Sequence, residues 1–130
     1  MTELETAERL FAAIAAKDVS AVGDLYAEDI EVWHNFSNRC QDKAANLQTL
    51  AGLCGSVDHL TYDVAERLQL DDGRILQRHV LRATPAGGVE IAIPACILLR
   101  IEGGRIKRID EYLDTGQAKR LRKATGRPAL

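Results

Sequence analysis

The chain has 130 residues, about the length of one domain, and a chain of this size buries roughly two thirds of its unfolded surface, which supports one core. Its 46% hydrophobic and 28% charged residues are typical of globular proteins and exclude the disordered, collagenous and coiled-coil classes. The 17 basic residues nearly balance the 19 acidic residues, so the formal net charge of −2 argues against binding to nucleic acid through phosphate contacts.

The first helix is expected from about Glu3 to Lys17. Thr2 and Glu5 have the spacing of a capping box, in which each side chain accepts a hydrogen bond from a backbone N–H group at the helix start. Apolar residues then recur at helical spacing on one face: Leu4, Ala7, Leu10, Phe11 and Ile14.

Two further helices are expected before residue 56. Asp18 or Ser20 caps the first of them, and residues 30–33 then become extended. The apolar face of this short helix is Val19, Val22, Leu25 and Tyr26, which places Tyr26 in the helical core without a catalytic role. Asp42 caps the third helix, which ends at Gly55. Its buried stripe is Leu47, Leu50, Leu53 and Cys54.

From Val57 onward the hydrophobic period changes to two, which predicts strands. Turn signals at residues 71–73, 85–88 and 102–104 divide this part of the chain into four runs of strand length or longer. Consecutive strands joined in this way form an antiparallel meander. The fold class is therefore α+β, with three N-terminal helices packed on one face of a mostly antiparallel sheet.

The two faces of the predicted strands differ in polarity. Near residues 75–83, the face without arginines is expected to contact the helices, and it carries Ile75, Gln77, His79, Leu81 and Ala83. Residues 91–101 are apolar on both faces, so we expect a second subunit to cover the outer face in a homodimer. Pro94 lacks an N–H donor and predicts a bulge that bends the sheet and leaves a cavity under it.

The cysteines and the termini bear on the compartment. Cys40, Cys54 and Cys96 lack metal-site spacing and are odd in number, which fits a reducing environment. The N-terminus is acidic where a targeting peptide is basic, and the longest apolar run is too short for a membrane span. We expect a cytoplasmic protein, with neither nucleic acid nor membrane as partner. Residues 117–130 are expected to be a basic, solvated tail after a domain of residues 1–116.

Two segments carry a family resemblance, in the context of this order of elements. They are Leu25-Tyr26-Ala27-Glu28-Asp29-Ile30-Glu31-Val32-Trp33-His34 and Glu102-Gly103-Gly104-Arg105-Ile106-Lys107-Arg108-Ile109-Asp110-Glu111-Tyr112-Leu113-Asp114. From Glu3 to about Gly116 the chain resembles the SnoaL-like branch of the nuclear-transport-factor-2-like superfamily. The resemblance implies a cone-shaped α+β barrel, often dimeric, with a pocket at its open end. The superfamily includes ketosteroid isomerases, polyketide cyclases, epoxide hydrolases, dehydratases and non-catalytic binding modules, so the resemblance does not select an activity.

The resemblance also shows what this chain lacks. Where ketosteroid isomerases have an oxyanion-hole tyrosine and a protonated aspartate, the corresponding residues are Leu10 and Ile97, so the donors for that reaction are missing. The isomerase base corresponds to His34, which could move a proton at neutral pH. The Arg-x-Asp motif of limonene-type epoxide hydrolases is matched by residues 78–80 without its carboxylate. The acidic residue on the last strand of SnoaL-like cyclases corresponds to Glu111.

We expect Glu111 to be the main acid or base, with His79 and His34 assisting. Glu111 lies on one strand face with Ile109 and Leu113, where desolvation would raise its pKa toward the range useful for proton transfer. The alternative is a flipped strand, in which Asp110, Arg108 and Asp114 share the cavity face and Glu111 is exposed. His79 is either a proton carrier on the same inner face or a hydrogen-bonded core histidine.

The remaining site predictions concern binding. Trp33, Asn35 and Phe36 join His34 at the expected pocket mouth and suit a flat organic ligand, although such aromatic residues could also plug the cone. Apolar lining is expected from Leu10, Ile14, Leu81, Ile97, Ile109 and Leu113. The spacing of the histidines and Glu111 selects no metal, and the expected chemistry needs no organic cofactor.

Two classes of function remain open. The first is general acid/base isomerisation, cyclisation or elimination on a small hydrophobic molecule, helped by exclusion of water. The second is a non-catalytic ligand-binding or protein-interaction module, which the missing isomerase donors favour.

Overall fold

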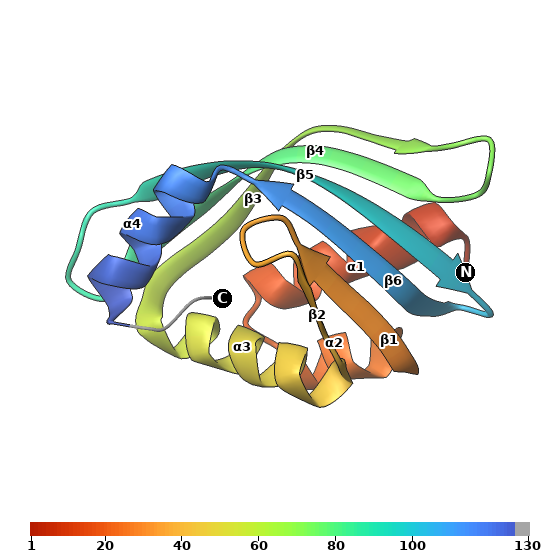
Figure 1. Cartoon of the computed structure of the whole chain (residues 1–130), viewed down its shortest axis with the longest axis horizontal. Coiled ribbons are helices and arrows are strands. Elements are labelled where there is room, and N and C mark those ends of the chain that lie inside the picture. The colour runs from red at the N-terminus through yellow and green to blue at the C-terminus, as the bar shows by residue number, and fades with distance from the viewer. Residues whose placement is uncertain (127–130) are drawn as a thin grey trace.

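A computed structural model describes residues 1–126 (Figure 1). In these residues four helices and six strands follow in the order α1 (Glu3–Ala15), α2 (Val19–Leu25), β1 (Tyr26–His34), β2 (Arg39–Gln41), α3 (Lys43–Ser56), β3 (Val57–Gln69), β4 (Ile75–Pro85), β5 (Ile91–Glu102), β6 (Arg105–Leu113) and α4 (Thr115–Thr125). None of these helices is long and apolar enough to cross a membrane.

Side-chain caps define the helix starts. Thr2 and Glu5 form the expected capping box on α1, and Asp18 and Asp42 accept backbone hydrogen bonds at the starts of α2 and α3. Helix α1 ends at Ala15 rather than at Lys17, because Lys17 has a left-handed backbone (φ 60°) that cannot continue the helix. The Lys17 ammonium instead donates to the carbonyl oxygen of Val57 at 2.6 Å, which ties α1 to the start of β3.

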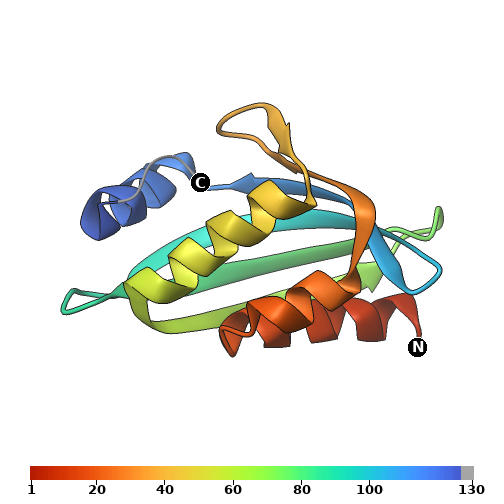
Figure 2. The ribbon, with the colours of Figure 1, turned by 90° about the horizontal axis from the view of Figure 1, so that it is seen from below.

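The six strands form one sheet in the order β2-β1-β6-β5-β4-β3. The predicted meander from β3 to β6 is confirmed, and the only parallel pair among the described strands joins β1 to β6. Helices α1, α2 and α3 lie across one face of the sheet in Figure 2. The α+β class is thus confirmed, but the edge strands β2 and β3 do not pair with each other, so the sheet is open and does not close into a barrel.

The inner and outer faces of β4 and β5 are as the alternation predicts. Ile75, Gln77, His79 and Ala83 are buried toward the helices, while Arg78 on the other face is exposed. The inner residues of β5 are likewise buried: Ile93, Ala95, Ile97 and Leu99.

Pro94 does not produce the expected bulge. Residues 91–99 of β5 pair with β4 without a register shift, and the irregularity of β5 lies at Arg100/Ile101. The carbonyl of Pro94 accepts the Asp114 backbone N–H, just after β6 ends. In a strand, the N–H and C=O groups of one residue point to the same side. The nitrogen of Pro94 therefore also points toward the end of β6, where the absence of an N–H group removes no hydrogen bond from inside the β5–β6 ladder.

Two further predictions are wrong. Tyr26 begins β1 and is not part of the helical face of α2. Much of the basic tail is not a solvated end: Thr115–Thr125 form α4, which is capped by Asp114 and buries Ala118 and Leu121 against the end of the sheet. The last four residues of the predicted tail lie outside the described residues.

Candidate functional site: an apolar cavity with a His34–Glu111 pair

A cavity of about 80 Å³ lies between the inner face of the sheet and helices α1 and α3. Most of its wall is aliphatic or aromatic, and its polar lining residues are histidine, glutamate, tyrosine, asparagine and threonine side chains. The lining residues are Leu10, Phe11, Ile14, Tyr26, Val32, His34, Asn46, Thr49, Leu50, Leu53, Tyr62, Leu81, Ile93, Ile97, Ile109, Glu111 and Leu113. The mostly apolar wall suits an apolar molecule, and the volume, which is below the roughly 300–1,000 Å³ of ordinary ligand pockets, limits that molecule to a small one.

Glu111 supplies the carboxylate of the cavity. It lies on the same face of β6 as Ile109 and Leu113, which both line the cavity, so the strand has the first of the two orientations considered above. Its Oε1 atom lies 3.0 Å from Nε2 of His34, and the two side chains are only 21% and 8% exposed. The second carboxylate oxygen, Oε2, has no hydrogen-bond partner within residues 1–126. A carboxylate held on one oxygen and open on the other is arranged to exchange a proton with a bound molecule.

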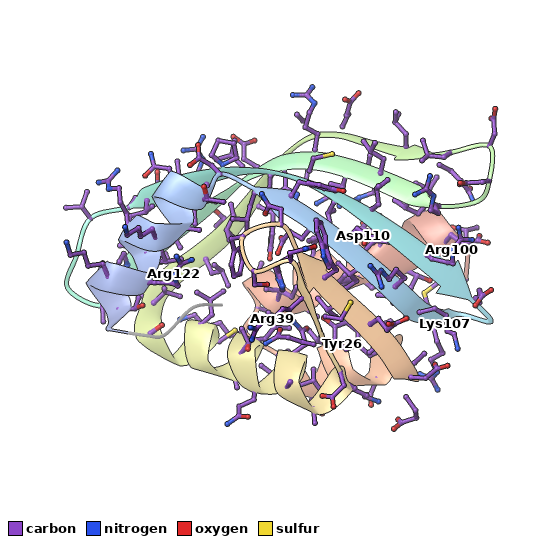
Figure 3. The ribbon with its side chains drawn as sticks, in the orientation of Figure 1. Tyr26, Arg39, Arg100, Lys107, Asp110 and Arg122 are labelled. Carbon is purple, nitrogen blue, oxygen red and sulfur yellow. The ribbon has the colours of Figure 1, made fainter. Side chains whose placement is uncertain are left out.

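A second polar group in the cavity is a chain of four side chains between β1 and α3. The Tyr26 hydroxyl donates to Oδ1 of Asn46 at 2.7 Å, and the Asn46 amide donates to Oε1 of Gln41 at 3.0 Å. The Gln41 amide in turn donates to the Thr49 hydroxyl at 2.9 Å. Figure 3 labels Tyr26 near the start of β1. Burial, with the charge of Glu111 adding to it, raises the pKa of Tyr26, so the phenol stays protonated and its proton is committed to Asn46.

A third polar chain lies beneath the wall, where Arg67, Gln77 and His79 meet. Nε of Arg67 donates to Oε1 of Gln77 at 2.7 Å, and Nε2 of Gln77 lies 2.9 Å from Nδ1 of His79. Burial lowers the pKa of His79; the charge of Glu111 opposes this shift, and that of Arg67 adds to it. His79 does not line the cavity, but its ring packs against Phe11 and Tyr62, which do.

The structure therefore brings some of the predicted residues together and separates others. His34 and Glu111 are paired in the cavity, and all six residues predicted as apolar lining are present in its wall. At the mouth, however, Trp33, Asn35 and Phe36 are not lining residues.

Each of these three side chains has a structural contact instead. Trp33 packs edge-on against Tyr112 with ring centroids 5.0 Å apart. Asn35 exchanges hydrogen bonds with the backbone of Leu113, and Phe36 lies between the His34 ring and the Arg122 guanidinium. These contacts end the β1–β6 pairing and cover His34, so the aromatic cluster acts as a plug beside the cavity.

Sequence reasoning missed the tyrosines and the polar residues of α3. The helical pattern places Tyr26 on the face of α2, and no local pattern marks Tyr62, Asn46 or Thr49. Tyr26 could have been found from β1 itself, because Ile30, Val32 and His34 alternate inward and Tyr26 falls on the same parity. A metal site is not formed: within residues 1–126, no three His, Cys, Asp or Glu side chains are grouped to hold an ion.

Three solved structures with low sequence identity share this fold. A protein of ketosteroid isomerase-like fold from Catenulispora acidiphila, solved in complex with trimethylamine, superposes with a TM-score of 0.77 at 18% identity, over 99% of this chain and 97% of its own. An LEH-like epoxide hydrolase from M. tuberculosis gives 0.77 at 15% identity, over 91% and 86%. TerC, co-crystallised with polyporic acid, gives 0.76 at 15% identity, over 92% and 96%.

No protein of curated function matches the sequence. The solved structures are similar in fold alone, because their identities to this chain are all below one fifth. The sequence model of the SnoaL-like domain, in contrast, matches residues 7–109, which include most of α1, all of α2 and α3, and most of the sheet. The chain therefore belongs to the SnoaL-like domain family.

Proposed function

We propose that this protein is a general acid/base enzyme that acts on a small, neutral, mostly apolar carbonyl compound in the cavity. Glu111 takes a proton from the substrate and returns it, in an isomerisation, cyclisation or elimination. The observation that carries the proposal is the Glu111 carboxylate, hydrogen-bonded to His34 on one oxygen and open on the other, in an otherwise apolar wall.

The surroundings of Glu111 support proton transfer. The aliphatic wall excludes water from a bound substrate, so that the carboxylate meets the substrate with little competition from solvent. His34 fixes the direction of the carboxylate through Oε1 and leaves Oε2 for the substrate proton. His79 is held apart from the cavity, so its contribution is indirect in this proposal. The reaction needs no organic cofactor.

The cavity also favours neutral substrates. No lysine or arginine lines it, so an anionic substrate would lose its hydration without gaining a cationic partner. The binding energy comes mainly from apolar surface removed from water against residues such as Ile93 and Ile97.

A second function is favoured by one specific observation. Leu10 and Ile97, which correspond to the donors of ketosteroid isomerases, both line the cavity with apolar side chains. A non-catalytic module that binds a hydrophobic molecule would need no more than this wall. The two functions differ in what Glu111 does, and the experiment below separates them.

Two proposals concern the state of the protein. We propose a homodimer formed through the outer sheet face, because Val80, Cys96, Leu98 and Tyr112 leave apolar surface there that the helices do not cover. The second proposal is that the protein lies in the cytoplasm. The chain has three free cysteines, of which Cys40 is exposed, and these fit a reducing compartment.

The test is exchange of the protons next to a ketone carbonyl with D₂O, followed by ¹H NMR for a series of small cyclic ketones beginning with 2-cyclohexen-1-one. Ketones that bind in the cavity should exchange faster with the wild-type protein than in buffer. Glu111→Gln should still bind them and should lose about 100-fold or more of the exchange rate. Glu102→Gln, on an exposed residue at the end of β5, is the control.

Each outcome decides between the alternatives. If bound ketones exchange no faster with wild type than in buffer, the binding-module function is correct. If Glu111→Gln and wild type exchange them equally fast and both faster than buffer, Glu111 is not the base. If no ketone of the series binds, the proposed substrate class is wrong.

A further inference from the structure

The Tyr62 hydroxyl is a hydrogen-bond donor of the cavity that the structure leaves without a partner. Tyr62 lines the cavity from β3, and its hydroxyl makes no hydrogen bond within residues 1–126. In this part of the chain, the fully buried side-chain nitrogen and oxygen atoms without a partner are His79 Nε2 and Arg122 Nη1. The Tyr62 hydroxyl is not among them, so it is not fully buried and remains accessible. Tyr26, the other phenol in the wall, already donates to Asn46. Of the two, Tyr62 alone has its proton available to a ligand.

The ring of Tyr62 is held by two other rings. The centroid of Phe11 lies 5.0 Å from that of Tyr62, and the centroid of His79 lies 4.9 Å from it at an interplanar angle of 84°. Phe11 and His79 are themselves 5.5 Å apart, so the three rings form a closed triangle. Edge-to-face packing of this kind restricts the ring of Tyr62, and therefore the direction of its hydroxyl.

His79 is held in turn by a buried polar chain whose donor directions can be worked out. Arg67 can only donate, so the Gln77 oxygen faces Arg67 and the Gln77 amino group faces His79. The Nδ1 atom of His79 is then an acceptor, and the neutral imidazole carries its proton on Nε2. Gln77 and His79 are 0% and 2% exposed, so water does not compete for these bonds.

Packing alone does not explain the hydrogen-bonded chain of Arg67, Gln77 and His79. A buried glutamine and histidine with one nitrogen unpaired destabilise the fold relative to apolar residues of the same size. The three residues come from the inner face of β3 and β4, where Arg67 and Gln77 are register partners. Their common effect is to fix the ring on which Tyr62 rests.

We propose that Tyr62 donates the hydrogen bond that stabilises the substrate oxygen during the Glu111 reaction, and that Arg67, Gln77 and His79 are positioning residues for it. The inference rests on the proposed function and adds a donor on β3, an element to which the family resemblance assigned none. It also assigns His79 a role as a neutral support rather than a proton carrier.

Glu111 takes the proton from the carbon next to the carbonyl, and the electron pair of that C–H bond forms a carbon–carbon double bond. The carbonyl π electrons move to oxygen, which accepts a hydrogen bond from Tyr62. Glu111 then returns to carbon either this proton or one that its partly exposed carboxyl has exchanged with solvent, which restores the carbonyl.

The environment keeps Tyr62 a donor throughout. Burial raises the pKa of Tyr62 well above its usual range, and the charge of Glu111 raises it further. The phenol therefore stays protonated beside the substrate oxygen. The base and the donor both line the cavity.

The first experiment measures the donor directly. The ¹³C carbonyl resonance of bound, labelled 2-cyclohexen-1-one should lie downfield of its position in hexane, because donation to the carbonyl deshields that carbon. Tyr62→Phe should return it toward the hexane value and lower the α-proton exchange rate about 100-fold, the loss typical of removing one oxyanion donor. Tyr112→Phe, the same change on the exposed outer face of β6, should leave the carbonyl shift unchanged. An unchanged shift in Tyr62→Phe would overturn the proposal.

The second experiment tests the positioning chain, first in the wild-type protein and then in a variant. The ¹⁵N spectrum of the wild type should show His79 neutral, with its proton on Nε2. A proton on Nδ1 would contradict the chain. Gln77→Met, which removes both bonds at similar volume, should mix the two tautomers and reduce the downfield carbonyl shift in the folded protein; an unchanged shift would show that the chain does not position Tyr62.

The two proposals fail in different ways. If Glu111→Gln abolishes exchange while Tyr62→Phe changes neither rate nor carbonyl shift, the acid/base function stands and the donor assignment is wrong. If the carbonyl shift depends on Tyr62 but no exchange occurs, Tyr62 is a binding group and the acid/base function is wrong, and with it the reaction step.

Discussion

His34 and Glu111 are register partners on the parallel strands β1 and β6, and their side chains meet at 3.0 Å between Nε2 and Oε1. Parallel neighbours lie about 4.8 Å apart, so a histidine and a glutamate at facing positions can bond without strain. The strands are distant in sequence, and everything from β2 to β5 lies between them. The candidate site therefore forms only when β1 and β6, the first and last strands in the sequence, have paired.

Breaking this pair should be measurable as stability. His34→Ala removes the hydrogen-bond partner of a carboxylate that is largely withdrawn from water, and we expect a loss of about 1–2 kcal/mol in the free energy of unfolding. Urea unfolding would measure it, with Glu111→Gln and the double variant completing a cycle. Lys107→Ala, which breaks the exposed pair with Asp29, should change stability much less. Additive effects of the two site variants would show that the pair contributes no coupling energy.

His79 should make stability depend on pH. Burial lowers its pKa from the usual 6.5, so between that value and its folded pKa the unfolded chain binds a proton that the folded chain does not. The contribution is complete above about pH 6.5 and is lost as the pH falls below it, with a slope of at most about 1.4 kcal/mol per pH unit. His79 contacts Gln77 and Tyr62 directly, and the charges that act on its pKa are those of Glu111 and Arg67.

The measurement is urea unfolding at several pH values between about 5 and 8. His79→Gln should reduce the slope between pH 5 and 6.5, whereas His59→Gln, on an exposed histidine of β3, should retain it. Equal slopes in wild type and His79→Gln would show that His79 titrates alike in both states.

The sequence was informative where a local pattern determined the structure. Period-two alternation placed Glu111 with Ile109 and Leu113, and Asp18 and Asp42 marked two helix starts, because side-chain direction and capping depend on a few neighbouring residues. The family resemblance extended this to the SnoaL-like domain, which is confirmed.

The errors occurred where distant parts of the chain decide the outcome. Tyr26 fits a helical face locally, but pairing with Ile106 on β6 draws it into β1. The tail is strongly basic, yet Leu121 finds a buried site at the end of the sheet and stabilises α4. The partnership of Gln77 with Arg67 depends on β3–β4 register, which no local pattern encodes.

The docking of α4 can be tested through Leu121, which is 2% exposed. Leu121→Ala should lower the free energy of unfolding by about 2–4 kcal/mol, as for other buried leucines. Lys119→Ala, on an exposed residue of the same helix, should change it by no more than about 0.5 kcal/mol. A similarly small effect of Leu121→Ala in urea unfolding would restore the solvated tail that the composition predicted.

The two faces of β5 offer a matched pair of variants. Ile97 is buried in the cavity wall and Leu98 is half-buried on the outer face. Ile97→Ala should cost about 2–4 kcal/mol and enlarge the cavity, so that larger ketones bind more tightly than they do to wild type. Leu98→Ala should leave ketone affinity unchanged. Binding titrations followed by NMR would check this, and equal effects of both variants would contradict the assignment of the cavity to the inner face.

The outer face should mediate self-association. Tyr112, half exposed beside Trp33, and Leu98 belong to the apolar surface that β4, β5 and β6 share. A charge there would be desolvated in a dimer without a partner, so Tyr112→Glu should shift the protein to monomer by at least about tenfold in dissociation constant. Sedimentation velocity over a range of concentrations would measure the shift. Val89→Glu, on an exposed loop between β4 and β5, should leave association unchanged. A wild-type protein that is monomeric at all concentrations would show that this apolar face needs no second copy to cover it.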